Sequence, residues 1–180
     1  MGMKLSKTDS RLLGILLFLA KFTALSLPLY LIAWSGAGLL PLQHSAAAGS
    51  VWMMNALGLE AHSERLLVYA GSGPFIFYIG PDCTGWKSML CLAALIIATA
   101  GVSMKKRLLG VAIGIPLVYL GNIMRIVAVV LAEMAYGYDA AMLIHDWLWQ
   151  AGLLALVLGI WLVWLRSGWL KKHIIALAKE

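Results

Sequence analysis

Long apolar stretches bounded by Lys and Arg constrain this chain more than any other feature of its sequence. Each is long enough for a helix to cross the hydrocarbon core of a bilayer, which takes about 20 residues. The chain is 62% hydrophobic and 12% charged, too few charges to cover a water-soluble domain. The sequence predicts an all-α integral membrane protein, a single domain (1–180) of about four transmembrane helices, at residues 12–34, 88–104, 108–135 and 147–165.

The positions of the cations predict the direction of each helix. Lys and Arg accumulate on the cytoplasmic side of a membrane, so the tails 1–11 and 166–180 and the turn at Lys105–Arg107 are expected in the cytoplasm. The net charge of +6 lies at these helix ends and forms no basic face, so nucleic acid is not an expected partner. We expect a multi-pass protein of the cytoplasmic membrane with a span, an outer or interfacial segment and a three-span core, at residues 12–34, 35–87 and 88–165.

Smaller elements are predicted in the outer segment. Pro41–Leu59 is apolar but interrupted by polar residues, which is typical of an amphipathic helix in the membrane interface. The alternative, a full crossing, would invert every later span. Leu66–Ala70 and Phe75–Gly80 are rich in aromatic and branched residues and flank Gly-Ser-Gly-Pro, which indicates a small extracytoplasmic hairpin. A loop at residues 136–146 is expected on the same side.

Three reactive side chains are predicted at one depth, near the outer surface of the bilayer. Counted from the cytoplasmic cations at about 1.5 Å per helical residue, Cys83, Arg125 and His145 lie about 33, 27 and 32 Å away. The hydrocarbon core is about 30 Å thick. A thiolate can attack a carbonyl, an imidazole can carry protons and a guanidinium can stabilise developing negative charge. Cys83 is also expected at a helix N-terminus, which favours a thiolate, although Asp82 opposes that effect.

The sequences around these positions resemble the archaeosortase/exosortase family. The resemblance covers roughly Pro81–Leu165 and rests on three motifs in a fixed order: Cys-Thr-Gly-Trp-Lys-Ser at 83–88, Gly-Asn-Ile-Met-Arg-Ile at 121–126 and His-Asp-Trp-Leu-Trp-Gln at 145–150. It implies a polytopic membrane cysteine transpeptidase that cleaves a C-terminal sorting signal from secreted proteins. That signal consists of a short motif, a hydrophobic helix and a basic tail.

The same resemblance implies a role for each residue of the site. Cys83 is the nucleophile, Arg125 stabilises the oxyanion and His145 carries the proton, with Asn122 and Asp146 in support. The site faces the extracytoplasmic side, the partners are secreted proteins that carry the signal, and the acceptor is an amine, with a membrane lipid favoured. No metal and no cofactor are expected.

Other interpretations of these residues stay open. Cys83 can be an inert apolar cysteine, and His145 an ordinary histidine at the end of a loop. Asn122 can orient Arg125, one helical turn away, or it can join two helices by a hydrogen bond. Arg125 can instead form an ion pair with Glu133, Asp139 or Asp146.

Two other classes of protein compete with a transpeptidase. A membrane thiol oxidoreductase would use Cys83 and Cys91, which on one continuous helix are too far apart for a disulfide. A non-enzymatic membrane subunit or scaffold would use the polar residues only to link helices. A metal site is disfavoured because no local ligand spacing joins its possible ligands, His44, His62, His145 and Cys83.

Overall fold

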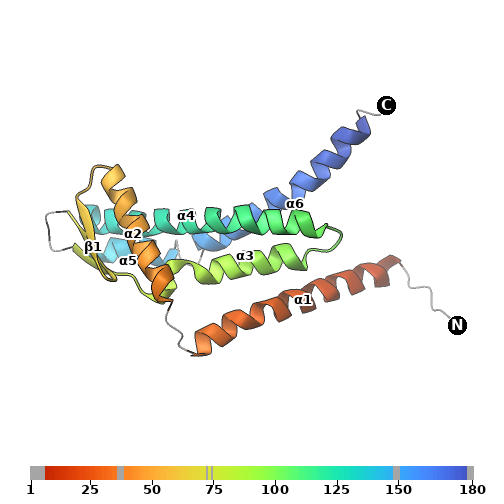
Figure 1. Cartoon of the computed structure of the whole chain (residues 1–180), viewed down its shortest axis with the longest axis horizontal. Coiled ribbons are helices and arrows are strands. Elements are labelled where there is room, and N and C mark those ends of the chain that lie inside the picture. The colour runs from red at the N-terminus through yellow and green to blue at the C-terminus, as the bar shows by residue number, and fades with distance from the viewer. Residues whose placement is uncertain (1–6, 36–38, 72, 74, 148–150, 178–180) are drawn as a thin grey trace.

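The computed structural model describes residues 7–35, 39–71, 73, 75–147 and 151–177. Within these residues the chain forms six α-helices, a short 3₁₀ helix and three strands (Figure 1). In chain order the elements are α1 (Lys7–Ser35), α2 (Leu40–Ala56), β1 (Ala61–Glu64), β2 (Leu67–Ala70), β3 (Phe75–Tyr78), η1 (Pro81–Thr84), α3 (Trp86–Ala98), α4 (Met104–Tyr136), α5 (Tyr138–Trp147) and α6 (Leu153–Leu177).

The helix α4 is the central element of the fold. It has 33 residues, and α2, α3, α5 and α6 all pack against it, while α1 leans on α3 (Figure 1). Among the described residues, α4 is the helix long and apolar enough to cross a membrane by length and composition. Shorter apolar helical segments coincide with the other three predicted spans, which stay predictions, at residues 12–28, 86–98 and 153–167.

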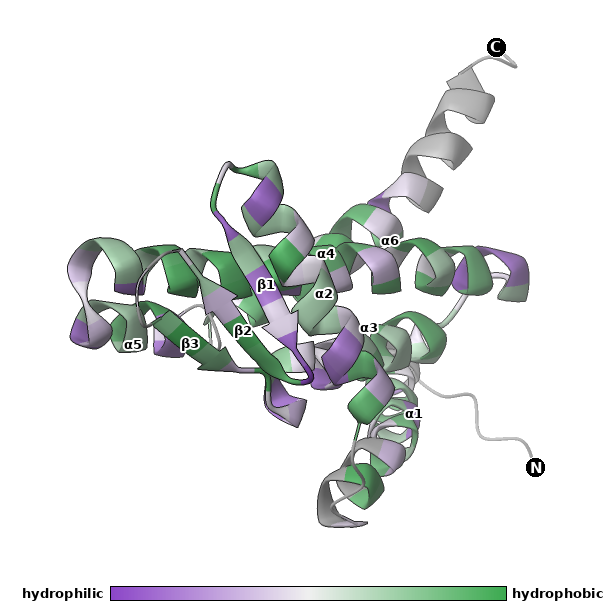
Figure 2. Cartoon of the chain, turned by 60° about the vertical axis from the view of Figure 1, so that its left-hand side comes forward, coloured by the Kyte–Doolittle hydropathy of each residue, from purple (hydrophilic) through white to green (hydrophobic). Residues whose placement is uncertain are grey.

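Large aliphatic side chains lie exposed along the helices. Leu12, Leu16, Leu108 and Ile113 are each more than half exposed. In water such a continuous apolar surface would favour association, since burying it gains about 25 cal/mol per Å². Hydrophilic residues gather at β1 and at the N-terminal end of α4, whereas most of the helical surface between is hydrophobic (Figure 2). This distribution fits helices that face lipid.

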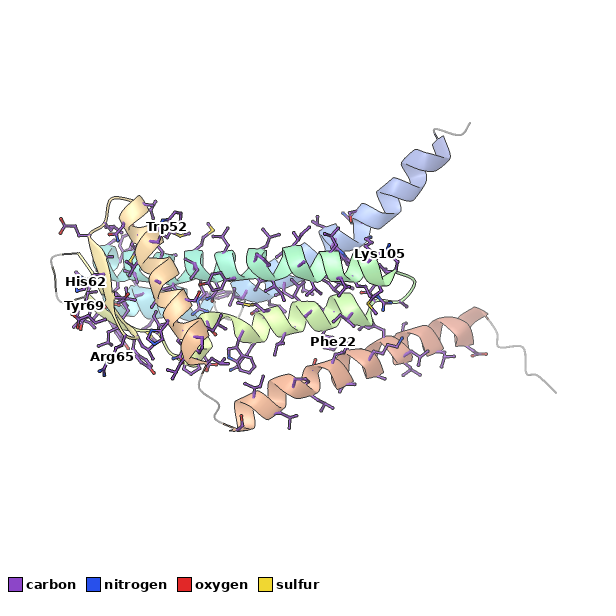
Figure 3. All side chains as sticks on the ribbon, in the orientation of Figure 1. Phe22, Trp52, His62, Arg65, Tyr69 and Lys105 are labelled. Atoms are coloured by element: carbon purple, nitrogen blue, oxygen red, sulfur yellow. The ribbon has the colours of Figure 1, made fainter. Side chains whose placement is uncertain are left out.

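Two clusters of buried apolar side chains stabilise the fold. The bundle cluster joins α3, α4 and α6 through Leu92, Ile96, Val118 and Val157, and Phe22 of α1 packs against it (Figure 3). The sheet-end cluster lies at the C-terminal half of α4, where that helix meets α2 and the sheet; its members include Ala46, Met54, Val68, Ile123, Ile126 and Val130. Because α4 contributes to both clusters, it holds the two ends of the molecule in a fixed relation.

The predicted hairpin forms part of a three-stranded antiparallel sheet. The strand β2 pairs with both β1 and β3, so that Tyr69 lies opposite His62 and Ile76. Its ring stacks on His62 at 4.7 Å between centroids (Figure 3). The sequence of β1, Ala-His-Ser-Glu, has low β-propensity and is mostly exposed, so nothing in it predicted a strand. The protein is mostly helical and contains the expected hairpin, and β1 adds a third strand that the sequence did not predict.

The helix α2 crosses α4 at an angle, near Tyr119 and Ile123, rather than running alongside it (Figure 1). This orientation agrees with an interfacial helix better than with a crossing. The expected amphipathic pattern is wrong, however, because the buried face includes the polar Gln43 and Ser50 while Trp52 is 71% exposed. The polar residues are buried because Gln43 and Ser50 bond to backbone carbonyls of Ile79 and Ala46.

The turn between α3 and α4 is earlier than predicted. The helix α3 ends at Ala98, and residues 99–103 make the turn, with Gly101 in the left-handed conformation (φ 72°). Ser103 caps α4 by accepting a backbone hydrogen bond from its first turn. Lys105–Arg107 therefore lie within α4 and not in the turn, because capping groups rather than charges set a helix end.

The expected loop at residues 136–146 is also wrong, because most of it is the helix α5. Gly137, with φ 84°, ends α4 and reverses the chain, so that α5 runs back along α4 (Figure 1). The last predicted span begins later than expected, at Leu153, and the helix continues into the predicted tail as far as Leu177. Residues 148–150, in the first turn of the predicted span, lie outside the described residues.

Gln43 ties α2 to the segment that leads into Cys83, and its substitution tests this connection. Its Nε2 donates to the Ile79 carbonyl at 2.9 Å in a buried position. The substitution Gln43→Met keeps the volume but leaves that carbonyl unpaired, a cost of about 1–3 kcal/mol. We expect a Tm several degrees lower in detergent, whereas His44→Met at the exposed neighbour leaves Tm unchanged. Equal Tm values for the two variants would contradict this role.

Candidate active site

Cys83 lies in η1, between the sheet and α3. The turn is held locally by Thr84, whose Oγ1 donates to the Pro81 carbonyl at 2.7 Å and accepts from the Trp86 amide at 3.4 Å. Cys83 is partly buried and packs against the sheet-end cluster. The helix α3 starts only at Trp86. The expected position of Cys83 at a helix N-terminus is therefore wrong, and the helix dipole has less influence there.

Asn122 joins η1 to α4 at the site. This fully buried side chain donates a hydrogen bond from Nδ2 to the Cys83 carbonyl oxygen at 2.7 Å. Its Oδ1 accepts from Nη1 of Arg125 at 3.4 Å. Both roles considered for Asn122 from the sequence are thus present, because one amide links two elements and also contacts the arginine.

Arg125 is the buried cation of the site. Its side chain lies one helical turn beyond Asn122 and is 5% exposed, and Asn122 links it to the backbone of Cys83. Burying a guanidinium is costly unless nearby groups compensate it, and charged residues within membrane helices mark functional sites by default. A guanidinium beside a thiol favours the thiolate and can stabilise an oxyanion formed next to it.

Gly85 allows η1 to approach α4 this closely. It has a left-handed backbone with φ 73°, and a Cβ atom there would lie 2.9 Å from Cγ of Asn122. Only glycine satisfies both the conformation and the contact. Sequence reasoning missed Gly85 as a site residue, although its place between Cys83 and a helical segment was an available signal for a turn.

Asp82 of η1 forms an ion pair with Lys87 in the first turn of α3. The Lys87 Nζ lies 2.7 Å from Asp82 Oδ1, and the two side chains are 41% and 58% exposed. Such an exposed pair contributes at most about 1 kcal/mol to stability. Its main effect at the site is that the Lys87 ammonium offsets the negative charge of Asp82 beside Cys83. That negative charge is the one expected from the sequence to oppose a thiolate.

His145 lies on α5, the helix that runs back along α4. Its Nδ1 is 3.3 Å from Oδ1 of Asp146, so the two predicted residues are in contact. The depth predicted for His145 assumed one helix as far as Arg166, whereas α5 and α6 are separate elements. Counting equal steps from Gly137 along α4 and α5 instead places His145 level with Val129, about 6 Å along the axis from Arg125.

The described contacts thus divide the predicted site into two parts. Cys83 and Arg125 are both hydrogen-bonded to Asn122, which joins the three residues. His145 and Asp146 form a pair on the neighbouring helix. The last three residues of their motif, 148–150, lie outside the described part of the chain. In that part, no group of three His, Cys, Asp or Glu side chains is arranged to hold a metal ion.

The buried polar cluster joins Cys83 to Asn122 and Arg125 of an Asn-x-x-Arg motif. The comparison with known families agrees with this combination of residues. The family model described as transmembrane exosortase (Exosortase_EpsH) matches residues 1–165. The chain belongs to this family. The match confirms the resemblance and extends it to the N-terminal segment. No curated protein and no solved structure shows a significant match.

Membership in the exosortase family places the chain in the membrane and indicates a transpeptidase of the sortase kind. It also suggests a cysteine peptidase or transpeptidase mechanism, which gives the polar cluster a chemical meaning. In that light, the hydrogen bond between Asn122 and the Cys83 backbone positions a candidate nucleophile against the cation of α4.

The contact between Gly85 and Asn122 can be tested with a matched pair of glycines. Gly58 shares the left-handed backbone (φ 83°) but has no atom within 4 Å of an added Cβ. Each alanine substitution costs about 1–2 kcal/mol through the backbone, and Gly85→Ala in addition pushes η1 away from α4. In a Cys91→Ala background, we expect maleimide to modify Cys83 faster in Gly85→Ala and at the unsubstituted rate in Gly58→Ala. The same rate in both variants would show that the contact does not hold Cys83.

Proposed function

We propose that this exosortase cleaves the C-terminal sorting signal of secreted proteins and transfers the new C-terminus to an amine, favouring that of a membrane lipid. The observation that carries the proposal is the link from Cys83 through Asn122 to the buried Arg125. It supplies a nucleophile and a fixed cation next to each other. Under the predicted topology, the site faces the extracytoplasmic side, where a secreted protein would meet it.

In the first half of the reaction, the Cys83 thiolate attacks the scissile carbonyl carbon. Arg125 stabilises the negative charge that develops on the carbonyl oxygen. His145, oriented by Asp146, donates a proton to the departing amine as the C–N bond breaks. The products are a thioester on Cys83 and the released segment, the hydrophobic helix with its basic tail.

In the second half, the amine of a lipid headgroup attacks the thioester carbonyl. His145, now neutral, accepts a proton from that amine, an amide forms, and the Cys83 thiolate is released. Water would instead hydrolyse the same intermediate. The packing of Cys83 against the sheet-end cluster supports transfer, because limited access of water lowers the rate of hydrolysis.

The positions of the two cysteines argue against a thiol oxidoreductase. Both are free; Cys83 packs against the sheet-end cluster, whereas Cys91 packs against the bundle cluster of α3, α4 and α6. A disulfide needs Cα atoms within about 7 Å. A pair of thiols in two separate clusters is a poor starting point for exchange.

The two cysteines also give a matched test of the nucleophile. The full chain is co-expressed with a secreted protein ending in a hydrophobic helix and a basic tail, and the mass of that protein is measured. We expect Cys83→Ala to abolish removal of the helix, and Cys91→Ala to retain it. The mass of the new C-terminus then separates transfer to an amine from hydrolysis.

Equal processing by Cys83→Ala and the unsubstituted protein would exclude Cys83 as the nucleophile. If Cys83→Ala instead retains association with the substrate but processes nothing, a pure scaffold role is excluded, because a scaffold loses no activity on this substitution.

Arg125 and Arg107 offer a second matched pair on α4. Arg107 donates to the Thr99 carbonyl at 2.8 Å near the other end of the helix. Removing an oxyanion-stabilising donor lowers kcat about 10²–10³-fold. We expect that loss in single-turnover cleavage by Arg125→Gln, a smaller loss in Arg125→Lys, which keeps the charge, and little change in Arg107→Gln. If Arg125→Gln cleaves as fast as Arg107→Gln, Arg125 has no electrostatic role in the reaction.

A further inference from the structure

A groove separate from the Cys83 site runs between α4 and α6. Its volume is about 1030 Å³, and both walls are apolar, formed by residues such as Leu109 and Ile113 of α4 and Ile160 and Val163 of α6. Val163 is 71% exposed. A Cβ atom added to Gly159, on the wall formed by α6, would meet no atom within 4 Å. The groove is therefore open toward the surroundings of the helices.

One end of this groove is positively charged. Lys105 and Lys106 line it beside Ser103 and Ser167, at the N-terminus of α4. Lys105 lies at the opposite end of α4 from the sheet (Figure 3). The Lys106 Nζ is 5.0 Å from the centroid of Trp164, which also lines the groove. The N-terminus of α4 carries a partial positive charge of its own, which adds to the positive potential of the two ammonium groups.

The length of the groove matches one leaflet of a bilayer. From the N-cap Ser103 to Leu117 the wall on α4 covers 14 steps along the helix, or about 21 Å. One leaflet together with its headgroup region is about 20–22 Å thick. The apolar end stops at Leu117, five residues or about 8 Å before Asn122. A molecule in the groove would therefore approach the Cys83 site without entering it.

We infer that this groove binds an anionic phospholipid of the leaflet at the N-terminal end of α4, which the positive-inside rule makes the cytoplasmic leaflet. Its acyl chains lie along the apolar walls, and its phosphate lies at Lys105 and Lys106. Basic pockets between transmembrane helices on this side recognise anionic headgroups. This site is independent of the proposed function, since the amine acceptor would act at the other end of α4.

The charge of the groove argues against the other possible occupants. A sorting-signal helix has a basic tail, which the two lysines would repel at the cytoplasmic end. A second copy related by an axis along the membrane normal would bring its own Lys105 and Lys106 to the same end. An anionic amphiphile complements both the charged end and the apolar walls.

Native mass spectrometry of the full chain in detergent tests the headgroup. The probes are phosphatidylglycerol and phosphatidylcholine with identical acyl chains. We expect about thirtyfold greater retention of phosphatidylglycerol, since the two lysines contribute about 1 kcal/mol each toward an anionic lipid. The double variant Lys105→Gln/Lys106→Gln should remove this preference, whereas Arg166→Gln, a cation of α6 outside the groove wall, should keep it. Equal retention of both lipids by the unsubstituted protein, or a preference that survives in the double variant, would overturn the inference.

A second pair of variants tests the groove itself. Gly159→Leu adds a side chain to the groove wall at a position where a Cβ atom meets no atom within 4 Å, and Ala112→Leu adds the same side chain at an exposed position of α4 outside the groove wall. We expect Gly159→Leu to lose retention of phosphatidylglycerol and Ala112→Leu to keep it, with unchanged circular dichroism in both. Retention in Gly159→Leu would overturn the site. A dimer that Gly159→Leu dissociates without any dependence on lipid would assign the groove to a second copy, and displacement of lipid by a sorting-signal helix would assign it to the substrate.

Discussion

The hydrogen bond from Asn122 to the Cys83 carbonyl is the interaction on which the arrangement of the site depends. It is a buried contact between a short 3₁₀ segment and the long helix α4. Leaving such a buried group unpaired would cost about 1–3 kcal/mol, so η1 has a definite position on α4. The other end of the same amide contacts Arg125. The Asn122 side chain thereby fixes the position of the Cys83 backbone relative to the Arg125 guanidinium.

This bond forms only because several unrelated residues allow η1 to reach α4. Gly85 supplies the left-handed backbone and leaves room for Asn122. Thr84 closes the 3₁₀ turn by donating to the Pro81 carbonyl. Gln43 of α2 donates a hydrogen bond to the carbonyl of Ile79, which precedes that turn in the chain. The sheet and α2 add the apolar packing of the sheet-end cluster around Cys83. The small outer elements are therefore a structural support for the cysteine as well as a cover.

The sequence predicted those features that depend on long-range composition or on a motif. The apolar stretches, the hairpin of β2 and β3, and the proximity of Cys83, Asn122 and Arg125 all have such signals. Local geometry was harder to predict. The strand β1 forms because Asn55 bonds to both backbone groups of Ala61, a tertiary effect that the polar sequence of the strand does not show. The helix α5 depends on the reversal at Gly137, which reads equally well as the start of a loop.

Arg125 and His145 differ in how their depth in the membrane follows from the sequence. Arg107 and Arg125 lie on one uninterrupted helix, so a constant rise per residue applies between them. The count to His145 crossed from α6 to α5, where the rise is not constant, and the level inferred from Gly137 uses the antiparallel path instead. Both counts place His145 near the C-terminal half of α4, which contains Arg125. Only the second count follows the helices α4 and α5 as the structure has them. Asn122 and Arg125 are thus positioned by α4 itself, whereas the position of His145 depends on the packing of α5 against that helix.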